Sequence, residues 1–135
     1  MDGLTPVQEM MTKNVIALHV DDPLRLVDKT FDKHHFHHIP ILDNDGKVAG
    51  IVSKEDILRL ISVRQEFTDK EFGRIKVKDF MSDKVVCITP DDSVGLAADM
   101  FITNHFHALP VVSQGGELVG IVTTHDLIKY AYKDV

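Results

Sequence analysis

The chain of 135 residues carries a net charge of −6, and 44% of its residues are hydrophobic and 27% charged. This composition is ordinary for a globular protein, and the length allows one compact domain or two small halves that share a core. The acidic charge argues against broad binding to nucleic acid or to an anionic membrane, because both need a basic field. No apolar run approaches the roughly 20 residues of a membrane span, and the first residues lack the pattern of a secretory signal. A single cysteine, Cys87, excludes an internal disulfide and fits a reducing cytoplasm, where we expect the protein to be located.

The sequence repeats itself after a shift of 70 positions, without a gap. The matched positions span the whole unit: Met11 with Met81, Phe31 with Phe101, Pro40 with Pro110, Gly50 with Gly120, and Asp56 with Asp126. We therefore predict one repeat at residues 1–62, a linker at 63–76 and a second repeat at 77–135, which together make one module. The linker is polar, and Phe67, Phe72 and Ile75 are spaced as in a partly buried connector.

Each copy begins with a β-strand pattern, at 15–18 and at 85–88, which ends at an acidic turn. Asp22-Pro23 and Asp92-Ser93 then predict a helix start, because an aspartate side chain can cap free amides and proline suits the first helical position. Apolar residues recur in this helix at helical spacing. They are Leu24, Val27 and Phe31 in the first copy and Leu96, Met100 and Phe101 in the second.

A β-hairpin and a second helix complete each copy. The hairpin strands are expected at 39–42 and 47–52, and again at 109–112 and 117–122, around turns that contain Gly46 and Gly116. The second helix starts at Ser53 or Thr123, with apolar positions Ile57, Leu58, Ile61 and Leu127, Ile128, Ala131. One such unit has too little core to be stable alone. We predict an α/β (α+β) fold of tandem β-α-β-β-α repeats, with two small sheets packed together and flanking helices.

These motifs resemble the CBS (cystathionine-β-synthase) domain pair, or Bateman module, over almost the whole chain. The resemblance is carried by the strand starts at 15–17 and 85–87, the His37–Ile41 and His107–Val111 steps, and two copies of a Gly-hydrophobic-x-Ser/Thr-x-x-Asp motif. That motif runs from Gly50 to Asp56 and from Gly120 to Asp126. Alone the motif is weak, but its repetition at the same place in a duplicated unit is specific.

The resemblance implies a non-enzymatic module that binds adenosine-containing ligands (AMP, ADP, ATP or S-adenosylmethionine and its relatives) and regulates an effector protein not identified by the sequence. It places the binding sites in two clefts, each built from both repeats, and requires no cofactor. The first cleft would use Ile16, Ala17, His37, His38, Ile39, Pro40, Thr123 and Asp126. The second would use Val86, Cys87, His107, Ala108, Leu109, Pro110, Ser53, Lys54 and Asp56.

The chemistry of these residue types suits such a ligand. An aspartate in the first turn of a helix can accept hydrogen bonds from both ribose hydroxyls, and charged acceptors make the stronger bonds. A Ser or Thr at a strand-to-helix junction lies near free helix amides, where a phosphate is favoured, although it can also be an ordinary cap. Because Lys54 follows Ser53 while Thr124 follows Thr123, we expect the second cleft to suit a polyphosphate and the first a nucleoside or monophosphate.

The histidines permit two interpretations. His37 and His107 occupy equivalent positions at the cleft borders, and His125 precedes Asp126, so all three are candidate phosphate donors whose protonation would make binding pH-dependent. The density of His34, His35, His37 and His38 also suggests a metal sensor, but no metal-ligand motif supports it, and we expect no metal site. Cys87 is expected to pack in a strand rather than to react.

Two functions from different classes therefore stay open besides the metal sensor. No nucleophile with a paired base and no P-loop is present, so we expect a ligand sensor and not an enzyme. The rival is a protein–protein interaction or dimerisation module with unoccupied clefts. A homodimer is the expected state, with Leu58, Ile61, Ile128 and Ala131 as candidate contacts, although burial within the monomer explains these residues almost as well. Neither nucleic acid nor membrane is an expected partner.

Overall fold

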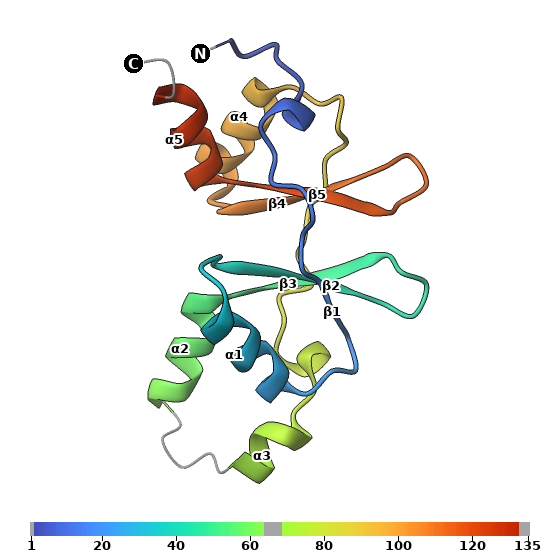
Figure 1. The fold of residues 1–135 in the computed structure, drawn as a ribbon, viewed down its shortest axis with the longest axis vertical. Helices are drawn as coiled ribbons and strands as arrows, with labels where there is room; N and C mark the ends of the chain where they lie inside the picture. The colour runs from blue at the N-terminus through green and yellow to red at the C-terminus, as the bar shows by residue number, and fades with distance from the viewer. Residues whose placement is uncertain (1, 64–68, 133–135) are drawn as a thin grey trace. The chain divides into compact units, whose positions relative to one another are not determined.

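The computed structural model describes residues 2–63 and 69–132, and its chain divides into two compact units. We call residues 16–85 the central unit, and residues 1–15 together with 86–135 the terminal unit. Figure 1 shows the N-terminal segment running beside elements of the second repeat, although these elements are far from the segment in the sequence.

The central unit contains a three-stranded sheet in the order β1-β2-β3. β1 runs parallel to β2, and β2 and β3 form the predicted antiparallel hairpin, in which His38 is the partner of Ser53. Gly46 in its turn has φ +77°, the left-handed conformation that glycine adopts most easily. The elements of this unit are β1 (Leu18–His19), α1 (Leu24–Lys33), β2 (His38–Leu42), β3 (Val48–Ser53), α2 (Lys54–Val63), α3 (Asp69–Arg74) and the 3₁₀ helix η2 (Val77–Asp79).

The terminal unit repeats this plan with a two-stranded sheet. β4 and β5 are antiparallel, Ala108 pairs with Thr123, and Gly116 in the turn has φ +84°. Its elements are the 3₁₀ helix η1 (Val7–Glu9), α4 (Val94–Asn104), β4 (Ala108–Val112), β5 (Leu118–Thr123) and α5 (Thr124–Tyr132). The predicted α/β class, with a duplicated unit, two small sheets and flanking helices, is confirmed.

Each unit has its own hydrophobic core. In the central unit the fully or almost fully buried side chains are Leu24, Val27, Phe31, Ile39, Ile41, Val52, Ile57 and Val77. In the terminal unit the core cluster consists of Val7, Ile88, Val94, Ala97, Phe101, Leu109, Val111 and Val122. The i, i+3, i+7 spacing of Leu24, Val27 and Phe31 explains why α1 buries one face.

The leading segments of the two repeats, residues 4–12 and 74–82, are exchanged between the units. Val7 comes from the first repeat but is buried in the core of the terminal unit, while Val77 of the second repeat is buried in the central unit. The backbone of Thr12 pairs with Ile121, and the backbone of Ser82 pairs with Ile51. Each repeat therefore completes the core and the sheet edge of the unit built mainly from the other.

Because the leading segments are exchanged, the compact units of the structure do not coincide with the two sequence repeats. The boundaries 1–62, 63–76 and 77–135 follow the sequence repeats, whereas the compact units are cut at 15/16 and 85/86. The repeat boundaries stay a prediction about sequence units. Of the predicted linker, Phe67 and the side chain of Phe72 lie outside the described residues, and Ile75 is partly buried against the central core.

Three local expectations were wrong. The first strands are shorter than 15–18 and 85–88: β1 covers only Leu18–His19, and in the second copy only Ile88 forms a bridge, with Val111. Asp22 does not cap α1, because its carboxylate accepts the backbone N–H of His19 at 2.7 Å, in the preceding turn. Leu96 is not a core position, since its side chain is 42% exposed and Val94 and Ala97 are buried instead.

None of the helices in the described residues is long and apolar enough to span a membrane.

Candidate functional site

The two strand-to-helix junctions have the same local geometry. At the start of α2, Ser53 Oγ accepts the backbone N–H of Asp56 at 3.0 Å. At the start of α5, Thr123 Oγ1 accepts the backbone N–H of Asp126 at 3.1 Å. Both hydroxyls are therefore helix caps, which satisfy an amide that has no partner within the helix. The cap places each aspartate in the first helical turn, half-buried.

The two aspartate carboxylates differ in their partners. Asp126 Oδ2 accepts the backbone N–H of Thr123 at 3.0 Å, which completes a reciprocal capping box. Asp56 Oδ1 instead lies 3.5 Å from Nη1 of Arg59, and the same guanidinium contacts Glu55 at 3.2 Å. Lys54 is partly buried beside them. The Ser53 junction thus carries two cations, Lys54 and Arg59, whereas Thr124 and Lys129 occupy these positions at the other junction, which has one.

The pre-proline segments lie beside these junctions within the same unit. The carbonyl of His37 accepts the N–H of Lys54 at 2.8 Å, and the carbonyl of His107 accepts the N–H of Thr124 at 3.1 Å. His38 and Ala108 are the cross-strand partners of Ser53 and Thr123. Each hairpin therefore gathers a pre-proline segment and a Ser/Thr-x-x-Asp junction at one end.

Some of the predicted ligand contacts are core residues. Ile39 and Leu109 have fully buried side chains in the cores of their own units. They can offer a ligand only backbone groups, because alternate residues of a strand point to opposite faces. Ala108 is also nearly buried, at 9% exposure.

The strand-start residues lie outside regular strands. Ile16 and Ala17 precede β1, and Val86 and Cys87 precede the Ile88 bridge. Val86 is 40% exposed, while Cys87 is half-buried, and burial raises the pKa of its thiol. The raised pKa fits the expectation that Cys87 packs rather than reacts.

Each predicted cleft draws residues from both units. The structure brings together, within one unit, the pre-proline segment and the junction that the sequence analysis assigned to different clefts. In the central unit these are His37–Pro40 with Ser53, Lys54 and Asp56, and in the terminal unit they are His107–Pro110 with Thr123 and Asp126. The composition of each cleft across the units stays a prediction.

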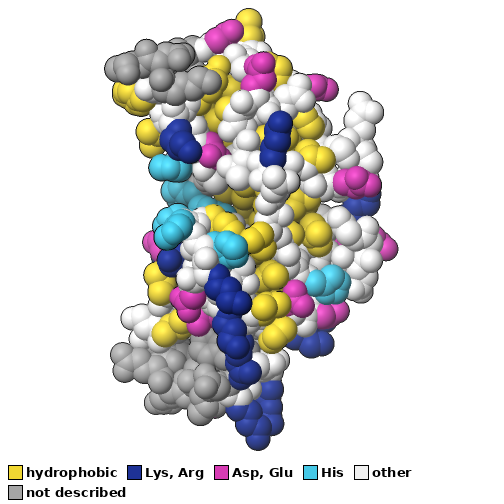
Figure 2. Space-filling model, in the orientation of Figure 1, with side chains coloured by type: hydrophobic (Ala, Val, Ile, Leu, Met, Phe, Trp, Pro, Cys, Tyr) yellow, Lys and Arg dark blue, Asp and Glu magenta, His cyan; other side chains and the backbone are white. Residues whose placement is uncertain are grey.

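The histidines of the central unit are mostly at the surface. His34, His35 and His37 are exposed, and His34 stacks on Phe36 with ring centroids 4.9 Å apart. Figure 2 shows several imidazoles on one face of the molecule. Within residues 2–63 and 69–132, no three His, Cys, Asp or Glu side chains are grouped as metal ligands.

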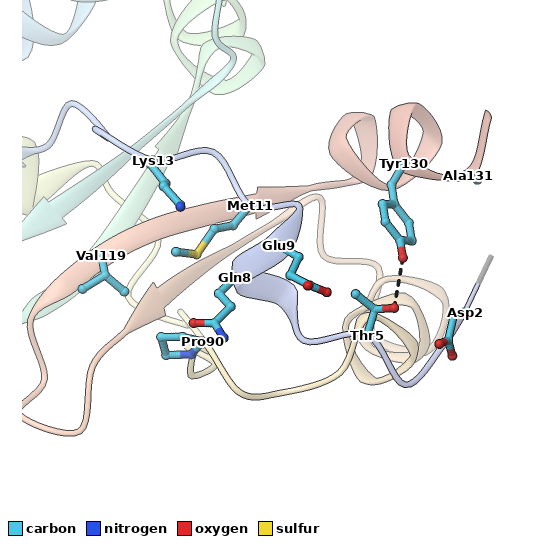
Figure 3. Close-up of a pocket in the computed structure, with 10 residues that line it drawn as sticks. All are labelled: Asp2, Thr5, Gln8, Glu9, Met11, Lys13, Pro90, Val119, Tyr130 and Ala131. Atoms are coloured by element: carbon cyan, nitrogen blue, oxygen red, sulfur yellow. Dashed lines mark hydrogen bonds between the residues drawn. The ribbon is translucent and has the colours of Figure 1, made fainter. Parts of the chain in front are cut away.

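An open cavity of about 1060 Å³ lies in the terminal unit, and none of the predicted ligand-binding residues lines it. Figure 3 shows its wall: Tyr130 Oη donates to Thr5 Oγ1 at 3.0 Å, and Glu9 and Lys13 line it from the leading segment. The sequence offered no signal for this cavity, because it depends on the exchange of leading segments.

Two further residues near the junctions were not predicted. Arg59 could have been found, since it follows Asp56 by three positions on a predicted helix. Thr12 could not, because its hydroxyl reaches Asp126 from 114 residues away, at 3.2 Å.

Comparison with known proteins identifies the family. The model of the CBS domain matches residues 7–63 and again 77–133, so this chain belongs to the CBS domain family and carries a pair of such domains. Protein MJ1426 of Methanocaldococcus jannaschii is 30% identical, over 91% of this chain and 89% of its own length.

Solved structures share the fold. The CBS domain pair of protein MJ0100, in complex with 5′-methylthioadenosine and S-adenosyl-L-methionine, is 26% identical, with a TM-score of 0.79 over 94% of this chain and 99% of that chain. CBSX2 in complex with AMP is 23% identical, with a TM-score of 0.79 over 96% and 97% of the two chains.

Proposed function

We propose that this protein is a non-enzymatic sensor that binds an adenosine-containing ligand and thereby regulates a partner protein. The observation that carries the proposal is the duplicated junction, in which a Ser or Thr cap holds an aspartate in the first turn of a helix. The ligands bound by the MJ0100 pair and by CBSX2 support the class of small molecule, since both hold an adenosine group.

The proposed binding residues are those of the two predicted clefts. Asp56 and Asp126 would accept the ribose hydroxyls, because a carboxylate makes strong, charge-assisted hydrogen bonds. The backbone beside Pro40 and Pro110 would read the edge of the base, and Ile16, Ala17, Val86 and Cys87 would contact its faces. His37, His38 and His107 border the same segments.

The two junctions favour different ligands. Lys54 and Arg59 give the Ser53 junction positive charge that a phosphate chain needs. The Thr123 junction has only one such cation, because Lys129 occupies the position of Arg59 while the uncharged Thr124 occupies that of Lys54. We therefore expect ATP and ADP to depend on Asp56, and S-adenosylmethionine or a nucleoside to depend on Asp126.

Isothermal titration with AMP, ADP, ATP and S-adenosylmethionine tests the proposal. Wild type is compared with Asp56→Asn and Asp126→Asn, which preserve side-chain size at the capped position, and with Asp99→Asn, an exposed carboxylate of α4, as the control. Loss of a charged acceptor should weaken binding at one junction by about tenfold or more. Absence of binding by the folded wild type to all four ligands would refute the sensor.

The border histidines are proposed to contact a phosphate group. His37, His107 and His125 are all exposed, and an imidazole N–H can donate a hydrogen bond to a phosphate oxygen. We expect His37→Ala or His107→Ala to weaken the binding of AMP by about tenfold, while the affinity for adenosine, which has no phosphate, stays unchanged. Equal losses of affinity for AMP and adenosine would reject this role.

A dimerisation function is favoured by a second observation. Leu58 on α2 and Ile128 on α5 occupy equivalent positions, and their side chains are 55% and 59% exposed. Burial within the monomer therefore does not explain them, whereas a homodimer interface would. Ile61 and Ala131 are partly buried at the same helices. We expect light scattering to show a dimer that Leu58→Ser and Ile128→Ser dissociate, while Leu4→Ser, at an equally apolar exposed position, leaves it intact.

A further inference from the structure

The side chain of Thr12 contacts the carboxylate of Asp126 in the terminal unit. Thr12 Oγ1 lies 3.2 Å from Oδ1 and 3.4 Å from Oδ2, so the hydroxyl donates to the carboxylate. Thr12 belongs to the leading segment of the first repeat, and Asp126 to the last helix of the second. The exchanged segment thus reaches a residue proposed to bind ribose.

The backbone fixes the position of Thr12. Its N–H donates to the carbonyl of Ile121 at 2.9 Å, and its carbonyl accepts the N–H of Ile121 at 3.0 Å. The segment approaches so closely that a Cβ on Gly120 would lie 3.0 Å from the Thr12 carbonyl oxygen. Because these backbone hydrogen bonds hold Thr12 on the edge of β5, its hydroxyl is positioned next to the carboxylate of Asp126.

The Asp126 carboxylate is therefore held from two segments. Thr12 donates to Oδ1, and the backbone N–H of Thr123 donates to Oδ2. A carboxylate offers about four acceptor directions, so both oxygens keep capacity for further donors. Two donors from different segments restrain both the χ1 rotamer of Asp126 and the plane of its carboxylate. A vicinal diol needs a carboxylate held in one orientation to make two simultaneous hydrogen bonds.

The other repeat provides an internal comparison. Ser82 occupies the position equivalent to Thr12, and its backbone pairs with Ile51 in the same way. In the described part of the chain, however, no hydrogen bond joins the Ser82 hydroxyl to Asp56, whose carboxylate contacts Arg59 instead. Among the described residues, a hydrogen bond from the leading segment to the junction aspartate is therefore found in the terminal unit and not in the central unit.

We propose that Thr12 is a positioning residue that orients Asp126 for the recognition of a ribose diol. The inference rests on the proposed function, because it assigns Asp126 the ribose. It adds that discrimination between ribose and deoxyribose at this junction is set by the leading segment of the other repeat.

Two measurements test the role of Thr12. In the free protein, the Hα–Hβ couplings of Asp126 should report one χ1 rotamer in wild type and in Thr12→Ser, and an average in Thr12→Val. In titrations, Thr12→Val should bind adenosine about tenfold more weakly while its affinity for 2′-deoxyadenosine changes little. Thr12→Ser should restore the preference for adenosine, and Ser82→Ala, the matched change in the other repeat, should leave it unaltered.

The outcomes separate the two proposals. Unchanged Asp126 couplings in Thr12→Val, or an equal loss of affinity for both nucleosides, would overturn the positioning role. Failure of wild type to bind either nucleoside, together with the expected change in the couplings, would refute ribose recognition and leave Thr12 as the group that orients Asp126.

Discussion

Asp21 forms an ion-pair cluster at the end of β1. Its Oδ1 lies 3.3 Å from Nζ of Lys78 and 3.8 Å from Nζ of Lys76, both in the leading segment of the second repeat. The hydrogen bond from Lys78 lowers the pKa of the Asp21 carboxyl. Desolvation opposes this shift, and the charges of Lys78, Lys76 and His19 add to it, so the pKa stays below its usual value. In the first repeat Pro6 and Gln8 stand where these lysines are, so only the central unit has the cluster.

The cluster predicts a pH-dependent stability. A carboxyl whose pKa is lowered by folding stabilises the folded state above its unfolded pKa of about 4, and the stabilisation is lost as the pH falls through the folded value. Asp21→Asn should therefore lower the urea midpoint at pH 7, and the gap to wild type should close as the pH falls below about 4. Asp91→Asn, the equivalent change in the second repeat, is the control. A gap that persisted unchanged at low pH would contradict the ion pairs as its cause.

Gly120 gives a second prediction for a single residue. A Cβ there would lie 2.5 Å from Met11 Sδ and 3.0 Å from the Thr12 carbonyl oxygen, so the Met11 side chain must move and the backbone at Thr12 is crowded. We expect Gly120→Ala to cost about 1–3 kcal/mol of unfolding free energy, as overpacking does. Gly115→Ala is the control, because a Cβ at Gly115 would lie 3.8 Å from Ser113 Oγ, which is an ordinary van der Waals contact. Equal denaturant midpoints for the two variants would contradict the close approach.

At the scale of elements, α4 is capped more strongly than α1. Ser93 Oγ accepts the N–H of Leu96 at 3.0 Å, whereas α1 begins after Pro23 with no side-chain cap. Ser93→Ala should therefore destabilise the protein by about 1 kcal/mol in chemical denaturation. Ser62→Ala, on the exposed surface of α2, should cost nothing measurable. A cost at Ser62 equal to that at Ser93 would show that capping is not the cause.

The hairpins and long helices could be predicted from the sequence, but the first strands could not. Each hairpin consists of two apolar runs on either side of one turn glycine, Gly46 or Gly116, and this pattern identifies the strands almost to the residue. β1 has only two residues, and the equivalent element of the second copy is a single bridge at Ile88. Both are too short for the two-residue periodicity of a β-strand to be recognised in the sequence. The junction aspartates were found because their motif occurs twice.

The exchange of leading segments could not be predicted, for a reason of symmetry. A chain that matches itself after a shift of 70 positions presents the same apolar pattern to both cores. Val7 and Val77 fit either core equally well on composition alone. Thr12 was missed as a neighbour of Asp126 because that contact exists only once the exchange is known.

At the scale of the whole molecule, the exchange makes each unit depend on the other repeat. Val7 is fully buried in the terminal unit, so Val7→Ala should cost about 2 kcal/mol through lost burial and a residual cavity. Hydrogen exchange should show the loss of protection in α4 and β4 of the terminal unit, and not in β2 and β3. Gln8→Ala, at an exposed neighbour, is the control. Lost protection in β2 and β3 alone would contradict the exchange.

Reciprocal exchange also determines how a single repeat would behave if it were made alone. A half-length chain would leave its own core open, yet its leading segment would fit the core of a second copy. Two separate copies could then complete each other, but only at concentrations high enough for them to meet. Joining them in one polypeptide makes that encounter intramolecular, so completion of both cores no longer depends on dilution. Tandem duplication of the coding sequence would thus keep the contacts of such a pair, and the stability of the folded protein would no longer depend on its concentration.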